Sequence, residues 1–523
     1  MRRHRRLSLA AVLAVGALAL TWRYTSALSL GESVLGLISE VKYTEGLVGI
    51  PQTLNPLYVS TDTERDLSRL IFRGLTQTSV TGEITPDLAE SWEASANGQS
   101  YLFHLKAGQR WQNGDPVTVE DVAFTYELAK NTDTGSPYTE TFKNLSVQII
   151  GSDAILFRLS ESFAPFLSLT NLGILPKKEV SKIDPGSLRV AKFNLNPIGS
   201  TDFRLTNLTT DGATFTRGAT TYIFRFYPTS DDLKVALKLG EVRAAGFTDQ
   251  ANFSDWKNLQ VFSSPLYRRF VAVFFNLRSS PGNEKGVRQG LSYAIDRSHL
   301  VNDVLGGAGE VAYSSIPPVS WAKANNLRHY DYKVDLAKSS LDKSGWAGGP
   351  VRAKEGKPLE IALSFRDNPA MRVVAQEVAK DWGAVGVRAI LSPLSAAEFK
   401  SKVIDAKDFQ AAIFTQEVGE DPDQYVLWHT TAAESTNITG LKLPKLDKAL
   451  EDGRHFVTED GRREKYADFQ RFLLDEEPVA FLYYPKYSYV VSTKVQGIDL
   501  KPLGVPTDRL FDVTNWKIAR VVF

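Results

Sequence analysis

The sequence contains no cysteine among its 523 residues. This absence excludes disulfides, thiolate zinc sites, iron–sulfur clusters, cysteine nucleophiles and lipid attachment through cysteine. An excess of one charge is also missing, because 61 Lys and Arg balance 60 Asp and Glu. A general nucleic-acid-binding protein would carry a basic surplus. We therefore expect no nucleic-acid partner.

Catalytic motifs are missing as well. The six His residues form no H-E-x-x-H pair and have no other zinc-like spacing. The chain has no G-x-S-x-G elbow and no G-x-x-x-x-G-K-[ST] phosphate loop. S-x-x-K matches such as those at Ser254 and Ser340 are expected by chance in a chain of this length. We therefore expect neither an enzyme nor a bound cofactor or metal.

Apolar residues are abundant enough to form substantial cores. Hydrophobic residues make up 43% of the chain and aromatic residues 11%. This composition excludes global disorder. At roughly 150 residues per domain, the length suggests about three domains.

The N-terminus has the composition of an export signal. Residues 1–27 contain five arginines and no acid, and residues 7–20 are uncharged. A basic segment before a short apolar run is typical of a signal peptide, with cleavage expected after Ala27. Because the run is shorter than the roughly 20 residues of a spanning helix, an uncleaved anchor extended through Trp22 is the alternative. We expect an exported protein, periplasmic or on the outer face of the cytoplasmic membrane, with membrane association only through this segment.

The remainder alternates strand and helix patterns. Strands are predicted from aromatic and β-branched runs at residues 101–106, 269–277, 359–365, 409–414 and 479–484. Helices are predicted from caps and apolar periodicity at residues 118–130, 230–240, 287–306 and 335–345. This alternation predicts mixed α/β domains. Since no long linker separates them, we expect domains joined by crossing strands.

Residues 415–440 are the strongest candidate for a binding segment. They follow a predicted strand, and open α/β sheets bind ligands beyond the carboxyl ends of their strands. Carboxylates there could receive an ammonium group, and aromatic rings could cover apolar side chains. The segment combines Glu417, Glu420, Asp421, Asp423, Tyr425, Trp428 and His429.

Two other interpretations of this segment stay open. The acidic side chains could bind calcium, although the EF-hand spacing is absent. Alternatively, Asp421, Pro422 and Asp423 could form a turn that caps a helix burying Tyr425 and Trp428.

Several short blocks together resemble one known family. They occur in that family's order at residues 45–56, 71–75, 84–92, 101–106, 111–124, 239–242, 275–277, 287–297, 337–346 and 421–429, with Asn437. Over roughly residues 42–500 the chain resembles the family 5 extracellular solute-binding proteins, the peptide-binding receptors of ABC importers.

The resemblance implies an α/β periplasmic-binding-protein fold of type II with two lobes and an extra inserted domain. Lobe I would comprise residues 40–74, 190–272 and 491–523. The inserted domain would span residues 75–189, and lobe II residues 273–490. A hinge of crossing strands is expected near residues 274–276 and 489–492.

The resemblance also implies candidate ligand-binding residues. In oligopeptide receptors of the family an Asp pairs with the peptide's N-terminal amine. The comparable position here is about Val418, so Glu417 is the candidate substitute. The other candidates are Asp423, Tyr425, Trp428, Asn437, Leu54 and Asn55.

The function implied is that of the substrate-binding component of an ABC importer. Such a monomer would capture peptides in an interlobe cleft and deliver them to permease subunits. A non-peptide solute, such as a nickel chelate or an oligosaccharide, is the alternative ligand. An exported enzyme or a chaperone that reuses the fold is a more distant alternative.

Overall fold

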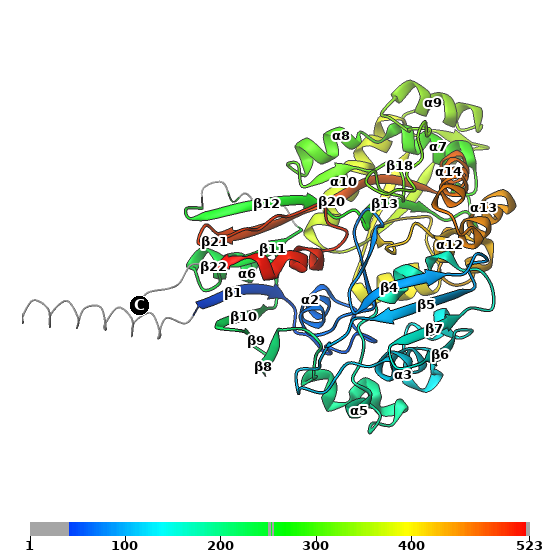
Figure 1. Ribbon diagram of the computed structural model, residues 1–523. Helices are drawn as coiled ribbons and strands as arrows, with labels where there is room; N and C mark the ends of the chain where they lie inside the picture. Colours follow the sequence, from blue (N-terminus) through cyan, green and yellow to red (C-terminus); the bar gives the residue numbers. More distant parts are fainter. Residues whose placement is uncertain (1–40, 249–252, 254–255, 519–523) are drawn as a thin grey trace, which may run out of the picture.

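The computed structural model describes residues 41–248, 253 and 256–518, and Figure 1 shows two halves joined through one sheet. The proposed signal peptide or anchor, residues 1–27, lies outside the described residues. No helix in the described ranges is long and apolar enough to cross a membrane.

A twelve-stranded mixed sheet runs through the molecule. Its main path begins in the upper half of Figure 1 and ends in the lower half. In spatial order the path is β18 (Arg388–Leu394), β17 (Glu360–Arg366), β19 (Ala411–Glu417), β13 (Arg269–Phe275), β20 (Val479–Ser492), β11 (Ala244–Phe247), β1 (Val41–Val48), β10 (Thr220–Tyr227), β9 (Gly212–Arg217) and β8 (Arg204–Leu208). Two further strands, β12 (Leu259–Pro265) and β14 (Gly309–Val311), also pair with β20.

Strand β20 belongs to both halves. Its first part pairs antiparallel with β13, and its last part pairs with β11 and β12. The hydrophobic cores divide at the same place. One core contains Leu266 and Tyr487 and extends back to Tyr43. Two others lie on the opposite side of the division, and they include Tyr267 and Tyr484.

A second, four-stranded sheet carries the small region at the lower right of Figure 1. Its order is β4 (Ala89–Ala94), β5 (Ser100–Leu105), β7 (Ala154–Arg158) and β6 (Ser146–Ile150). Its buried side chains belong to the same core as Tyr43, so this region is continuous with the lower half. Three two-stranded sheets complete the β structure: β2 (Thr76–Thr78) with β3 (Ile84–Pro86), β15 (Ala353–Lys354) with β16 (Lys357–Pro358), and β21 (Val495–Gln496) with β22 (Lys517–Ile518).

Helices pack on both halves. In the lower half they are α2 (Asp62–Ile71), α3 (Val119–Lys130), α4 (Thr139–Phe142), α5 (Lys177–Val180) and α6 (Ser230–Leu239). In the upper half they are α7 (Lys285–Ala294), α8 (Arg297–His299), α9 (Val334–Lys343), α10 (Pro369–Ala384), α11 (Ala396–Glu398), α12 (Tyr425–Trp428), α13 (Pro444–His455) and α14 (Glu459–Glu476). Short 3-10 helices include η2 (Ala164–Asn171), η4 (Lys192–Leu195) and η8 (Pro506–Asn515).

The expected mixed α/β architecture is confirmed, with local differences. Helix α6 is capped by Thr229, one residue before the expected Ser230, and ends at Gly240 with a φ of 76°. The single helix expected over residues 287–306 is wrong. It is broken after Ala294, because Asp296 accepts a hydrogen bond from the backbone N–H of His299 and starts a new helical segment. The residue boundaries proposed for the lobes stay a prediction.

A buried ion triad fixes the C-terminal segment to the lower half. The guanidinium of Arg509, in η8, lies 2.5 Å from Glu45 and 2.7 Å from Asp66. Glu45 belongs to β1 and Asp66 to α2, and all three side chains are at most 3% exposed. The triad therefore joins the opening strand, the first helix and the end of the chain.

Replacing Arg509 with Met is expected to lower the free energy of unfolding by about 3–5 kcal/mol, because two buried carboxylates lose their cation. Urea denaturation measures the change. Arg471→Met is the matched control: Arg471 pairs with Asp468 on the surface, and its loss should cost less than about 1 kcal/mol. Equal stability of the two variants would contradict the account.

Candidate ligand-binding cavity

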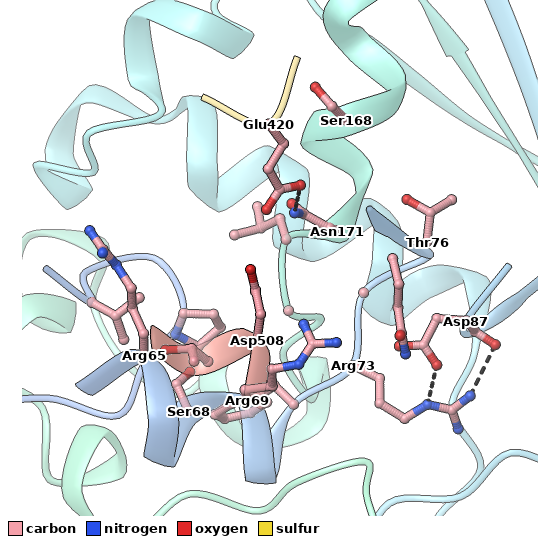
Figure 2. A pocket seen from close by; sticks show the side chains of 18 of the residues that line it. Arg65, Ser68, Arg69, Arg73, Thr76, Asp87, Ser168, Asn171, Glu420 and Asp508 are labelled. Atoms are coloured by element: carbon pink, nitrogen blue, oxygen red, sulfur yellow. Dashed lines mark hydrogen bonds and ion pairs between the residues drawn. The ribbon is translucent and has the colours of Figure 1, made fainter. Parts of the chain in front are cut away.

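A cavity of about 720 Å³ lies where the two halves face each other. One wall comes from α2, η2 and η8, and the other from the loop after β19 together with Arg268 and Arg454. Figure 2 shows Arg65, Ser68 and Arg69 on α2 below the Glu420 side chain. The volume falls in the range of roughly 300–1,000 Å³ that is typical of small-ligand sites.

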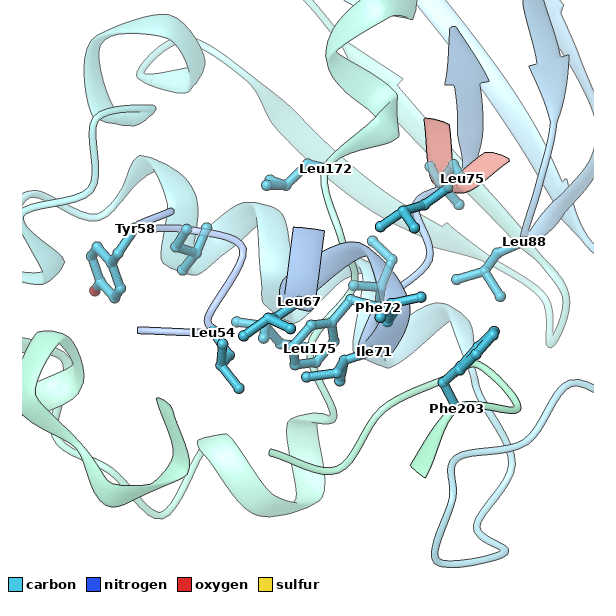
Figure 3. Packing of buried hydrophobic residues seen from close by; sticks show 14 of the residues in the cluster. Leu54, Tyr58, Leu67, Ile71, Phe72, Leu75, Leu88, Leu172, Leu175 and Phe203 are labelled. Carbon is cyan, nitrogen blue, oxygen red and sulfur yellow. The ribbon is translucent and has the colours of Figure 1, made fainter. Parts of the chain in front are cut away.

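Helix α2 is positioned by its cap and its apolar face. The Thr61 side chain accepts a hydrogen bond from the backbone N–H of Glu64, and the Glu64 carboxylate accepts one from the N–H of Thr61. The apolar face packs Leu67 and Ile71 into the core, as Figure 3 shows. Because residues four apart share one helix face, the opposite face carries Arg65 and Arg69 along the cavity.

An ion-pair network crosses from α2 to the upper half. Arg269 in β13 donates to Asp62 at 2.5 Å and to Glu417 at 2.9 Å. Glu417, at the end of β19, also accepts from Arg65 at 3.1 Å. Burial by itself would raise the pKa of Asp62, but the hydrogen bonds and charge of Arg269 outweigh it, so the pKa lies below its ordinary value.

Glu420 projects into the cavity from the loop after β19. Its carboxylate accepts hydrogen bonds from the Arg268 guanidinium at 2.8 Å and from the Asn171 amide at 2.6 Å. Asn171 ends η2 in the lower half, so this contact also spans the cavity. Burial raises the pKa of the Glu420 carboxyl, although the charge of Arg268 opposes the shift.

Asp423 lines the cavity on the same wall as Arg454. Its carboxylate accepts from Arg454 Nε at 2.8 Å and from the backbone N–H of Tyr425 at 3.1 Å. The guanidinium carbon of Arg454 lies 4.0 Å from the centre of the Tyr425 ring and 5.2 Å from that of Phe163. Burial raises the pKa of Asp423, and Arg454 opposes the shift.

The acidic residues of this segment pair with arginines and do not form a cation site. Glu417, Glu420 and Asp423 have the arginine partners described above, and Asp421 pairs with Arg462 at 2.5 Å. The calcium interpretation therefore lacks free carboxylates. Within the described part of the chain, no group of three or more His, Asp or Glu is arranged to hold a metal ion.

The sequence-predicted site residues divide into two sets. Glu417 and Asp423 line the cavity, whereas Tyr425, Trp428, Asn437, Leu54 and Asn55 are not among its lining residues. Trp428 is 1% exposed and donates from its indole to the Gln424 side chain at 2.9 Å. Trp428 is thus buried as the turn interpretation of residues 421–428 expected, because its ring packs in the core beside Phe274. Tyr425 stacks on His429, with 3.9 Å between the ring centres.

The remaining three candidates are fully buried. The Asn437 amide donates to the Leu441 carbonyl at 2.9 Å, and its carbonyl oxygen accepts from Thr439. Asn55 donates to the Asn194 side chain at 3.0 Å and accepts from the backbone N–H of Leu57. Leu54 is fully buried. In this structure these contacts stabilise loops and turns.

Several arginines that line the cavity are not marked as binding residues by any local sequence motif. The arginines of α2 could have been noticed by their i, i+4 spacing on a capped helix. Arg268 and Arg454 could not, because their partners are far away in the chain.

Replacing Trp428 with Ala is expected to reduce the free energy of unfolding by about 3–5 kcal/mol, as for other large buried aromatic residues. Thermal or urea unfolding gives the measurement. Val426, 54% exposed on the same helix, provides the control: Val426→Ala should stay within about 0.5 kcal/mol of the parent. A Trp428→Ala protein as stable as this control would show that Trp428 has no role in the core.

Comparisons with known proteins agree with this architecture. The sequence model of the bacterial extracellular solute-binding proteins, family 5, matches residues 83–437. The oligopeptide-binding protein AppA of Bacillus subtilis is 26% identical over 502 residues, which cover 91% of each chain.

Solved structures show the same fold. The AppA structure from Bacillus subtilis in complex with a nonapeptide has a TM-score of 0.76 at 23% identity, and the match covers 92% of this chain and 99% of that one. NikZ from Campylobacter jejuni in complex with Ni(L-His) has a TM-score of 0.78 at 24% identity, with 91% and 99% covered. The expected two-lobed binding-protein fold is thereby confirmed. The chain belongs to the bacterial extracellular solute-binding proteins of family 5, which are substrate-binding proteins and not enzymes.

Proposed function

We propose that this protein is the extracytoplasmic substrate-binding component of an ABC importer, and that it captures short peptides in the cavity between its halves. One observation carries the proposal: the cavity of about 720 Å³ takes its walls from both halves. A ligand held there contacts both walls at once and can favour the closed arrangement. Delivery to permease subunits would follow from opening.

The chemistry of the walls suits a peptide. A free peptide has an ammonium group, a carboxylate and side chains of varied polarity. The cavity lining includes the carboxylates of Glu417, Glu420 and Asp423, and a ligand ammonium group would share or replace their arginine partners. Its apolar surface includes Phe163, Leu169, Leu172 and Phe511. The relatives that are named as oligopeptide- and dipeptide-binding proteins support the same ligand class.

Roles for the seven candidate residues follow from their contacts. Glu417 and Asp423 would face the ligand directly. Tyr425 would act through Arg454, which it stacks against. Leu54, Asn55, Trp428 and Asn437 would hold the loops on which the lining residues sit.

The network of Asp62, Arg269 and Glu417 supports a closing mechanism. It joins α2 to β13 and β19, so it exists only when the two walls are close. A ligand shifts an open–closed equilibrium only through its different affinity for the two states. The network would stabilise the closed state and so add to this difference in affinity. Asp62 would do this without contacting the ligand, because it does not line the cavity.

The remaining features of the proposal concern the whole protein. We infer that it is exported, that it acts as a monomer, and that residues 1–27 are either cleaved or retained as an anchor. We keep lobe I as residues 40–74, 190–272 and 491–523, the inserted domain as residues 75–189, and lobe II as residues 273–490.

Purification without denaturation should yield a protein that carries peptides. Native mass spectrometry is expected to show a set of masses that fragment as short peptides. Calorimetry with the stripped protein and di- to nonapeptides should then give saturable binding. A single non-peptide mass, or no heat with any peptide, would contradict the peptide proposal.

Asp62→Asn is expected to weaken the affinity for every bound peptide about fivefold to tenfold, since loss of roughly 1 kcal/mol of closed-state pairing corresponds to that change. Small-angle scattering should show a larger radius of gyration for the unliganded variant. Glu140→Gln, which removes an exposed pair with Lys143, is the control and should change neither quantity. Unchanged affinity in Asp62→Asn would exclude a role for the network in closure.

A further inference from the structure

The arginines that line the cavity are not equivalent. Four of them have carboxylate partners: Arg65 with Glu417, Arg73 with Asp87, Arg268 with Glu420, and Arg454 with Asp423. A fifth, Arg217, donates to the backbone carbonyl of Thr514. The sixth is Arg69. Among the described residues, no hydrogen bond or ion pair joins its guanidinium to a partner, although it is half-buried.

The setting of Arg69 leaves its N–H groups available. Arg69 lies in the last turn of α2, and its guanidinium carbon stands 4.0 Å from the centre of the Phe511 ring. Stacking on an aromatic ring covers one face of the guanidinium plane. The N–H donors lie in that plane, so the stack orients them without using them. Figure 2 shows the side chain leaving α2 beside Asp508.

Two acidic groups near Arg69, Asp508 and Glu420, already accept hydrogen bonds from other residues. Asp508 accepts hydrogen bonds from the backbone N–H groups of Gly504 at 2.8 Å and Val505 at 3.0 Å. Glu420 accepts from Arg268 and Asn171. Phe511 and Asp508 both belong to η8, which the buried triad of Arg509 fixes against α2. Arg69 is therefore held in place and partly desolvated. Its charge acts to lower the pKa of Glu420, but among the described residues no carboxylate accepts a hydrogen bond from it.

We propose that Arg69 binds a carboxylate of the peptide ligand through its free guanidinium edge, and so makes the cavity selective for that anionic group. An arginine and a carboxylate match in shape and can form two parallel hydrogen bonds. A partly buried guanidinium whose N–H donors have no acceptor costs free energy that a ligand anion can offset. The inference rests on the proposed peptide function. The carboxylate can come from the C-terminus of the peptide or from an Asp or Glu side chain.

A double-mutant cycle tests this inference by calorimetry. The probes are tetra-alanine, its C-terminal amide, and tetra-alanines with one Ala replaced by Glu or by Gln at each position. The protein variants are the parent, Arg69→Gln, and Arg69→Lys, which keeps the charge but loses the planar fork. Arg158→Gln is the matched control, because Arg158 is exposed on β7 and does not line the cavity.

The parent protein and Arg158→Gln are expected to lose about tenfold or more in affinity when the recognised carboxylate is neutralised. In Arg69→Gln that loss should shrink to about twofold or less, and Arg69→Lys should lie between. If the Arg69→Gln change removes the effect of amidating the peptide, Arg69 recognises the C-terminal carboxylate. If it removes the effect of replacing Glu with Gln in the peptide, Arg69 recognises a side-chain carboxylate. Either result supports the inference.

Two results would overturn it. If peptides bind but neutralising a carboxylate costs the same in the parent and in Arg69→Gln, the inference fails while the peptide function stands. If no peptide binds the parent, the proposed function fails and the inference falls with it. The unfolding midpoints of the three variants should be measured as well. We expect them to be close to that of the parent, which would show that weaker binding does not result from unfolding.

Discussion

The molecule depends on one strand that belongs to both of its halves. Strand β20 is hydrogen-bonded to β13 over residues 479–483 and to β12 over residues 486–492. Pro485 lies between these stretches, and Pro265 ends β12 beside it. A proline has no backbone N–H, so the ladder is weakened where the strand passes from one half to the other. We propose that the halves bend about this point, which precedes the hinge residues expected from the sequence, 274–276 and 489–492.

This constraint explains where the cavity lies and why charges line it. Residues at the start of β13 and after β19 face α2 and η2 across the bend. The polar groups brought together there need partners when water is removed. Glu417 and Glu420 find theirs partly across the cavity, in Arg65 and Asn171. In the proposed closing mechanism such contacts would form only when the walls are close. The cavity wall would then also be the part of the protein that senses closure.

Stability and recognition are carried by different charges on the same helix. Asp66 of α2 points into the core and binds Arg509. Arg65 points toward the upper half and pairs with Glu417. Arg69 points into the cavity against Phe511, and among the described residues no carboxylate accepts a hydrogen bond from it. One amphipathic helix therefore anchors the C-terminal segment, links the halves and leaves one cation for a ligand.

Much of the fold could be predicted from the sequence, and less of the site. Strands such as β13 and β17 were predicted because aromatic and β-branched runs are local signals. The break after Ala294 was missed, because apolar periodicity continues across it and only the cap at Asp296 ends the helix.

The site was harder to predict because its geometry depends on contacts between distant residues. Trp428 was a candidate for ligand contact, but which face of a four-residue helix is buried depends on Phe274, more than 150 residues earlier in the chain. Pairing between Arg65 and Glu417 could not be predicted for the same reason. Arg69 differs from the other cavity arginines in having no hydrogen-bond acceptor among the described residues, and this difference appears only when the partners of the others are known.

A crystal structure of the protein with a bound tetrapeptide would show whether the cavity between the halves recognises a ligand carboxylate. We expect the peptide to lie between α2 and the loop after β19, with one carboxylate against the guanidinium of Arg69 and with the contact between Asp62 and Arg269 intact. A peptide bound elsewhere on the surface, or a ligand carboxylate remote from Arg69, would contradict it.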